Sequence, residues 1–421
     1  MGSTVKTSRF APVRLPTLPA IDGVRFATAE AGIRYKGRTD VLLAVFDAGT
    51  VAAGVLTKSK TCSAAVLHCR ANLASRRDGP TAARALVVNS GNANAFTGRR
   101  GKEAVDITVD FALRAVGAFE GGGVYVASTG VIGEPLDPAK FVGLLGDMAR
   151  TAHADRFEAA ARAILTTDTY PKLATRTVDI GGVAVTLNGF CKGAGMIAPD
   201  MATMLCFLFT DAAIDARVAQ ALIAKHADTT FNCMTVDGDT STSDTCLLFA
   251  TGAAVKRGQA PVVDMADPRL CAFDAALHDL MRDLAIQVAK DGEGLTKFVT
   301  FRVTGAESWS AARRIALSCA NSPILKTAIT GEDPNWGRVV MAVGKSGEAA
   351  DRDRLSISFG PYCVARDGER SAEYVEATVA AYMKNAEIEI AIDVGVGSGS
   401  ATVWTCDLTH DYVSINADYR S

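Results

Sequence analysis

The chain has 421 residues, of which 48% are hydrophobic and 21% are charged. This composition can build a substantial core and excludes wholesale disorder. The formal net charge of -2 gives no general attraction for nucleic acid. There is no apolar run long enough for a membrane span. The first twenty residues carry Pro, Arg and Ser where a signal peptide has its apolar centre, so we expect a cytoplasmic protein.

The predicted elements alternate between strands and helices along the chain. In order, we expect strands at 41–46 and 85–89, a helix at 102–119, a strand at 123–127, a long helix at 138–165 opened by Asp137 as N-cap, strands at 178–187 and 204–209, helices at 218–231 and 270–289, a strand at 297–303, a helix at 311–329, and strands at 388–394 and 401–408. This alternation predicts an α/β or α+β protein. The Gly-rich stretch 395–399 is typical of a hairpin turn, because a strand follows it rather than the helix that a nucleotide-binding loop requires.

Neither the cysteines nor the histidines predict a metal site. The ten cysteines form no CxxC pair and are spread along the chain, several of them in apolar runs, so we expect reduced core thiols. The five histidines stand far apart and form no ligand pair.

The stretch from Lys192 to Phe209 combines a loop containing Gly and Pro with an apolar strand, and it predicts a self-cleavage site. Ala202-Thr203 lies where loop and strand meet. A threonine hydroxyl held there can attack the carbonyl of Ala202, and hydrolysis of the resulting ester leaves Thr203 as a new N-terminus. Its α-amine, with an ordinary pKa of about 7.7–8.0, can then serve as the base. The pair alone also fits an ordinary turn that enters a core strand.

The string KGAGMIAPDMATML resembles the cleavage signature of the ornithine acetyltransferase family, the bifunctional glutamate N-acetyltransferases of arginine biosynthesis. The resemblance extends from about Ala20 to Ser421. Further blocks resemble that family in the family's order: 89–98 (NSGNANAFTG), 128–133 (STGVIG), 166–172 (TTDTYPK), 291–294 (DGEG), 331–338 (GEDPNWGR) and 415–421 (INADYRS).

The resemblance implies a fold, a reaction and an assembly. The fold would be a layered α/β/α sandwich, similar in layering to N-terminal nucleophile enzymes. Cleavage would give an α chain, residues 1–202, and a β chain, residues 203–421, assembled as a heterotetramer of two α and two β chains. Thr203 would take the acetyl group from N2-acetyl-ornithine and pass it to glutamate in a ping-pong reaction without a cofactor. Some members also use acetyl-CoA as donor, and the residues leave open whether this chain does.

The resemblance also assigns roles to particular residues. Thr129 and Gly130 would stabilise the oxyanion, and Lys192 and Glu293 would face the carboxylate and the amine of the substrate. By local sequence alone, these are an ordinary turn and two solvated charges. The complete set of implied substrate contacts is Thr166 or Thr167, Lys192, Thr203, Glu293, Asn416 and Ser421.

Two other functions fit parts of the pattern. An N-terminal nucleophile amidase or aminopeptidase would use the same Thr203 but admit water in place of glutamate. A non-catalytic α/β binding protein would hold a small metabolite in its Gly-rich loops and would stay uncut, so the intact mass of the purified protein separates it from both enzymes.

Overall fold

A computed structural model describes residues 6–75, 82–117, 122–198 and 204–417. Three predicted site residues, Ala202, Thr203 and Ser421, lie outside this range. Within it, every helix is too short or too polar to cross a membrane.

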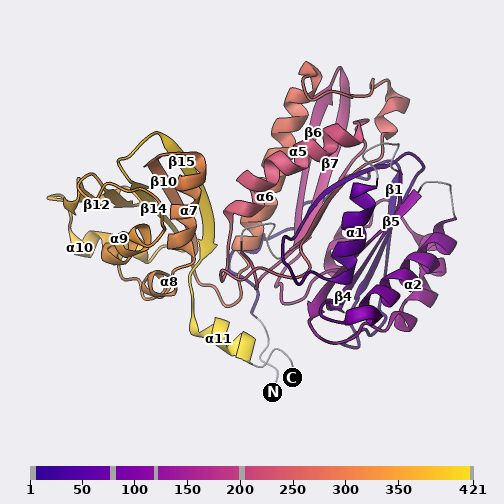
Figure 1. Cartoon of the computed structure of the whole chain (residues 1–421), viewed down its shortest axis with the longest axis horizontal. Coiled ribbons are helices and arrows are strands. Elements are labelled where there is room, and N and C mark those ends of the chain that lie inside the picture. Colours follow the sequence, from indigo (N-terminus) through magenta and orange to yellow (C-terminus); the bar gives the residue numbers. More distant parts are fainter. Residues whose placement is uncertain (1–5, 76–81, 118–121, 199–203, 418–421) are drawn as a thin grey trace.

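The larger lobe in Figure 1 is built on nine described strands. They are β1 (Val24–Ala29), β2 (Val41–Phe46), β3 (Val51–Leu56), β4 (Ala82–Asn92), β5 (Gly122–Val131), β6 (Lys172–Ile180), β7 (Val183–Lys192), β8 (Leu205–Thr210) and β9 (Thr245–Ala250). One half of the sheet joins β1, β2, β4 and β5, and the other joins β3, β9, β8, β7 and β6. Among the described residues, β3 and β4 pair only at Val51 and Ala82, and this pair links the halves.

The two half-sheets face each other across an aromatic core. Phe26 of β1 lies 5.1 Å from Phe209 of β8, and Phe46 of β2 lies 4.4 Å from Phe249 of β9, measured between ring centroids. Successive side chains of a strand point to opposite faces. Phe207 and Phe209 therefore enter this core while Leu208 packs toward the helices. This explains why β8 is apolar from Leu205 to Phe209.

Helices cover the outer faces of both half-sheets (Figure 1). They are α1 (Ala64–Ala74), α2 (Gly98–Val116) and α3 (Leu145–Thr151) on one side, and α5 (Ala216–Thr229) and α6 (Cys271–Ala289) on the other. The short helix α4 (Phe157–Ala163) packs into the aromatic core through Phe157. The predicted α/β class with outer helical layers is confirmed. Its β layer consists of the two half-sheets that face each other.

The smaller lobe in Figure 1 contains a six-stranded sheet in the order β13-β12-β11-β14-β10-β15. Its strands are β10 (Phe298–Ala306), β11 (Ser356–Phe359), β12 (Tyr362–Arg366), β13 (Glu369–Arg370), β14 (Glu387–Asp393) and β15 (Gly399–Cys406). Its helices are α7 (Trp309–Ala320), α8 (Pro323–Thr330), α9 (Trp336–Gly344) and α10 (Glu376–Met383), and α11 (His410–Ala417) follows β15. The apolar core under α6 continues into this sheet.

The prediction of a single helix at 138–165 is wrong, because the segment forms short separate helices. Asp137 is an N-cap, as predicted, and accepts a hydrogen bond from Ala139, but only a short 3-10 turn follows it. α3 then ends at Thr151, and His153 exchanges backbone hydrogen bonds of 2.9 Å with Phe26 of β1 before α4 begins. A pairing with a distant strand therefore breaks a pattern that is locally helical.

The strand predicted at 178–187 is instead the turn of a hairpin. Gly181 and Gly182 have φ values of +64° and +88° and connect β6 directly to β7. Two consecutive positive φ angles are what a tight two-residue hairpin loop requires. β7 then ends at Lys192, one of the predicted site residues.

Two further predictions from spacing are wrong. The helix expected at 311–329 is divided into α7 and α8 at Pro323, because proline cannot donate a backbone hydrogen bond within a helix. The stretch 395–399 is not a hairpin turn, because β10 lies between β14 and β15. Val396 and Gly397 instead donate to the carbonyl of Gly305 at the end of β10. The ten cysteines are all free thiols, as predicted, but only seven are core residues, because Cys271 is exposed and Cys62 and Cys363 are half-buried.

Candidate active site

A cavity of about 110 Å³ lies where loops from both parts of the chain meet. It brings together six of the predicted site residues, although they are up to 287 positions apart (129 to 416). Both candidate threonines of the 166–169 loop line it. The lining residues are Ala93, Thr129, Gly130, Ile132, Thr166, Thr167, Lys192, Gly195, Met196, Ser241, Thr242, Ser243, Glu293 and Asn416.

Thr129 and Gly130 lie near the end of β5, where this strand pairs with Ser90 and Gly91 of β4. The backbone at Gly130 has φ of +131°, and a Cβ there would lie 2.5 Å from the backbone nitrogen of Asn92. The strand pair can approach this closely only with glycine at the position. The Thr129 hydroxyl accepts a 3.3 Å hydrogen bond from the ammonium of Lys192.

Lys192 is the last residue of β7, and its side chain is almost fully buried. Burial lowers the pKa of its ammonium, while the negative charges of Asp168, Glu293 and Asp244 act in the opposite direction. No carboxylate among the described residues forms an ion pair with it. The ammonium is therefore available for the carboxylate of a ligand.

Glu293 lies in the turn that follows α6 and faces the same cavity. Its backbone N–H donates to the carbonyl of Ala194 at 2.8 Å, and its Oε2 accepts from the Asn416 side chain at 2.7 Å. A Cβ on Gly195 would lie 2.5 Å from the Glu293 Cδ, so glycine leaves the room that the carboxyl occupies. Burial raises the pKa of Glu293, against the lowering effect of hydrogen bonds from Asn416 and Thr167.

One wall of the cavity was not predicted. Ser241, Thr242 and Ser243 line it, within the polar run 237–244. Asp237, at the start of this run, accepts hydrogen bonds from the backbone of Met196 at 2.7 Å and from that of the next residue at 2.9 Å. The density of serine, threonine and aspartate is the signal that could have identified this wall.

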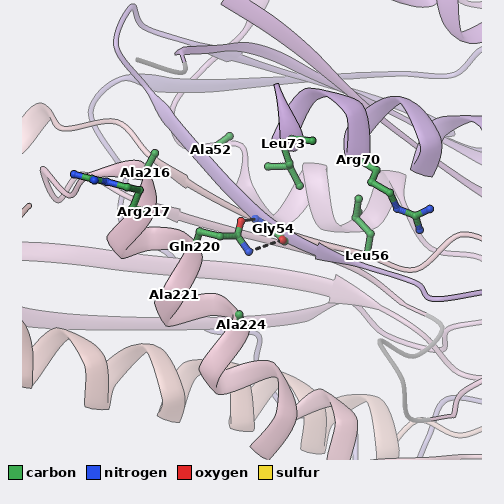
Figure 2. Close-up of a pocket in the computed structure, with 11 residues that line it drawn as sticks. Ala52, Gly54, Leu56, Arg70, Leu73, Ala216, Arg217, Gln220, Ala221 and Ala224 are labelled. Carbon is green, nitrogen blue, oxygen red and sulfur yellow. Dashed lines mark hydrogen bonds between the residues drawn. The ribbon is translucent and has the colours of Figure 1, made fainter. Parts of the chain in front are cut away.

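A larger hollow, of about 680 Å³, lies elsewhere, between α1 and α5. Figure 2 shows Gln220 of α5 against Gly54 of β3, where its side-chain amide donates to the Gly54 carbonyl at 2.9 Å and accepts from the Gly54 N–H at 3.0 Å. The Gln220 amide therefore makes the two backbone hydrogen bonds that a neighbouring strand would make, at a point where β3 no longer pairs with β4. None of the predicted site residues lines this hollow and its walls are mostly apolar, so the smaller cavity is the candidate active site.

Comparison with known proteins agrees with the predicted resemblance. The model of the ArgJ family matches residues 25–421. An arginine biosynthesis bifunctional protein ArgJ from Agrobacterium fabrum is 60% identical, with 99% of this chain and 100% of that protein covered. The chain belongs to the ArgJ family.

Solved structures include other members. An ArgJ crystal structure from Bacillus halodurans is 37% identical over 50% of this chain and 97% of the solved chain, with a TM-score of 0.48. An ornithine acetyltransferase from Mycobacterium tuberculosis, solved with ornithine, is 32% identical over 43% of this chain and 93% of the solved chain, with a TM-score of 0.36. The family assignment rests on the sequence matches over nearly the whole chain.

Proposed function

We propose that the chain is a self-processing acetyltransferase that moves an acetyl group from N2-acetyl-ornithine to glutamate through an ester on Thr203. Membership of a family whose relatives are named bifunctional proteins of arginine biosynthesis supports this reaction. The observation that carries it is the cavity itself, in which Lys192 and Glu293 supply opposite charges beside Thr129 and Gly130.

These charges suit the two amino-acid substrates. Both ornithine and glutamate carry an α-carboxylate, which the Lys192 ammonium can bind. Ornithine adds a cationic δ-amine, for which Glu293 is the counterpart. A single small cavity with one cation and one anion thus fits two substrates that bind in turn.

In the first half-reaction, the Thr203 hydroxyl attacks the acetyl carbonyl of N2-acetyl-ornithine, and the Thr203 α-amine takes the hydroxyl proton. The tetrahedral oxyanion needs preorganised donors, which we assign to the Thr129 hydroxyl and the Gly130 N–H. The C–N bond then breaks, the α-ammonium returns the proton to the departing amine, and ornithine leaves an acetyl ester on Thr203.

In the second half-reaction, the neutral amine of glutamate attacks this ester. The Thr203 α-amine takes the proton lost by the nucleophile, and the threonine hydroxyl is restored as N-acetylglutamate departs. The name bifunctional among the relatives supports a second donor as well. We therefore propose that acetyl-CoA can form the same ester, with release of the CoA thiol.

The catalytic α-amine requires cleavage between Ala202 and Thr203. We propose that the mature protein consists of residues 1–202 and 203–421, assembled as two α and two β chains, and that Ser421 joins Asn416 at the substrate. Edman sequencing of the smaller and larger fragments, with light scattering of the native protein, tests the cleavage site and the assembly.

The deciding assay mixes purified, cleaved protein with N2-acetyl-ornithine and glutamate, and separately with acetyl-CoA and glutamate. We expect N-acetylglutamate in both mixtures and parallel double-reciprocal lines in the first, as a shared acetyl-enzyme requires. Thr203→Ala should stay a single chain without activity. Acetate release that does not depend on glutamate would identify a hydrolase instead, and cleavage of the Thr203→Ala protein would refute the assigned nucleophile.

A further inference from the structure

A buried ionic cluster lies directly behind the candidate active site. The ammonium of Lys172, the first residue of β6, lies 2.7 Å from Asp168 and 2.6 Å from Asp291, and all three side chains have 0% exposure. Charged side chains are almost never buried this completely unless they are paired. None of the three lines the cavity, so the roles assigned above leave them unexplained.

The cluster holds three separate loops. Asp168 accepts hydrogen bonds from the backbone of Thr166 at 3.1 Å and of Gly193 at 2.6 Å. It therefore ties its own loop to the residue that follows Lys192.

Asp291 makes the matching connection on the other side. It accepts from the backbone N–H of Thr169 at 2.9 Å and from the Thr169 hydroxyl. It lies two residues before Glu293, whose N–H is bound to Ala194. Each of the three connected loops thus carries a residue assigned to substrate binding: Thr166, Lys192 or Glu293.

We infer that Asp168, Lys172 and Asp291 are positioning residues of the acetyl transfer, which set the distance between Lys192 and Glu293 by fixing the three loops to one buried cation. This inference rests on the proposed function. None of the three residues lines the cavity, so the cluster acts through the backbone of the loops. Rigid support of this kind is what holds a binding constellation in productive geometry.

The cluster also defines the charge that surrounds Lys192. Two carboxylates, Asp168 and Asp291, face one ammonium from Lys172, and Lys192 is the next cation near Asp168. If Lys172 became neutral, Asp168 would attract Lys192 away from the cavity. A loss of substrate binding would therefore accompany the loss of loop order.

The chain offers a control on the same strand, β6. Arg176 of β6 binds Asp279 of α6 at 2.7 Å and Asp283 at 3.1 Å. It joins β6 to the body of α6 rather than to the loops, and it lies four residues further along β6, about 13 Å from Lys172 by strand geometry. Arg176→Met should lower stability without disturbing the three loops.

The experiment compares wild type, Lys172→Met, Asp168→Asn and Arg176→Met as cleaved protein. Hydrogen exchange of peptides covering 192–198 and 291–295 measures loop order without reference to activity, and kcat and KM for acetyl-ornithine and glutamate measure the consequence. We expect exchange to become at least about tenfold faster and kcat/KM to fall at least about tenfold for Lys172→Met and Asp168→Asn, with both unchanged for Arg176→Met.

The outcomes separate the two proposals. Unchanged exchange at these peptides in Asp168→Asn, or an equal kinetic loss in Arg176→Met, would overturn the positioning role, and Asp168→Asn decides if Lys172→Met does not fold. A wild type that transfers no acetyl group refutes the proposed function, while the exchange data still decide whether the cluster orders the loops.

Discussion

Gly130 gives the sharpest test of the oxyanion assignment, because the backbone there excludes any side chain. With φ of +131°, Gly130→Ala would place a Cβ 2.5 Å from the Asn92 nitrogen and 2.7 Å from the Gly91 Cα. Both atoms belong to the backbone of β4, so no side chain can rotate away to relieve the contact. The loop itself must move.

The expected effect follows from two magnitudes. Non-glycine residues held in sparsely populated backbone regions cost on the order of 1–3 kcal/mol, which should appear as lost stability. Relief of the contact requires a shift of about 1 Å, and a misplacement of that size can cost about 10²-fold in rate. Loss of one oxyanion donor costs about 10²–10³ in kcat. We therefore expect kcat of Gly130→Ala to fall by at least about 10²-fold.

Gly133→Ala is the control, because Gly133 shares the positive φ, at +88°, but has open space around its Cβ position. It should lose stability through backbone strain and keep kcat within about threefold of wild type. Thermal unfolding and kcat are measured on cleaved protein, with rates corrected for the folded fraction. A Gly130→Ala enzyme with nearly normal kcat, or an equal loss in Gly133→Ala, would refute the reasoning.

Three further predictions concern single residues. Burial raises the pKa of Glu293, so as pH falls its carboxylate should take up a proton at a higher pH than an ordinary glutamate does. The rate of the ornithine half-reaction should therefore fall on the acid side of its pH profile, and Glu293→Gln should remove this fall. An unchanged acid side in Glu293→Gln would exclude Glu293 as its source. Burial likewise raises the pKa of Asp244, against the lowering effects of hydrogen bonds from Thr57 and Ser241 and of the charge of Lys192. The contribution of Asp244 to stability is therefore complete below the pKa of the unfolded chain and is lost as pH rises through the pKa of the folded chain. Asp244→Asn should therefore gain on the order of 1 kcal/mol over wild type at pH 7 and little at pH 4 in urea unfolding, and equal differences at both pH values would contradict this. Thr129→Ala should lower kcat about 10²–10³-fold with a smaller change in KM, and an unaltered kcat in mature protein would remove Thr129 from the mechanism.

Strands buried on both faces were predictable from sequence, whereas those with mixed faces were predicted only in part: β10 and β14 were found and β6 was not. β2 is apolar throughout and β8 is apolar up to its last residue, Thr210, and their boundaries agree closely with the predictions. β6 was missed because Arg176 and Asp179 interrupt its apolar pattern. Arg176 is satisfied there by acidic residues of α6, which lies about a hundred positions away. Sequence spacing carries no information about such a partner.

The cavity shows the same limit. A family resemblance could single out Thr129, Lys192 and Glu293, but local patterns gave each a more ordinary interpretation. The buried Lys172 was predictable by neither route, because a lysine followed by a β-strand pattern is most often solvated. Its burial depends on carboxylates from two other loops that become neighbours only in the folded chain.

The proposed cleavage site lies between two strands that the fold holds together. β7 and β8 pair antiparallel from Leu187 with Thr210 to Lys192 with Leu205. β3, from the first fragment, also pairs with β9 of the second, and α6 of the second fragment packs on β6 and β7 of the first. Cutting one peptide bond leaves these hydrogen bonds and the apolar core in place, so separation of the fragments would require exposure of the core. We therefore expect the two fragments to elute together from a native size-exclusion column and to separate on a denaturing gel. Separate elution under native conditions would show that the strand pairing does not hold the mature chains together.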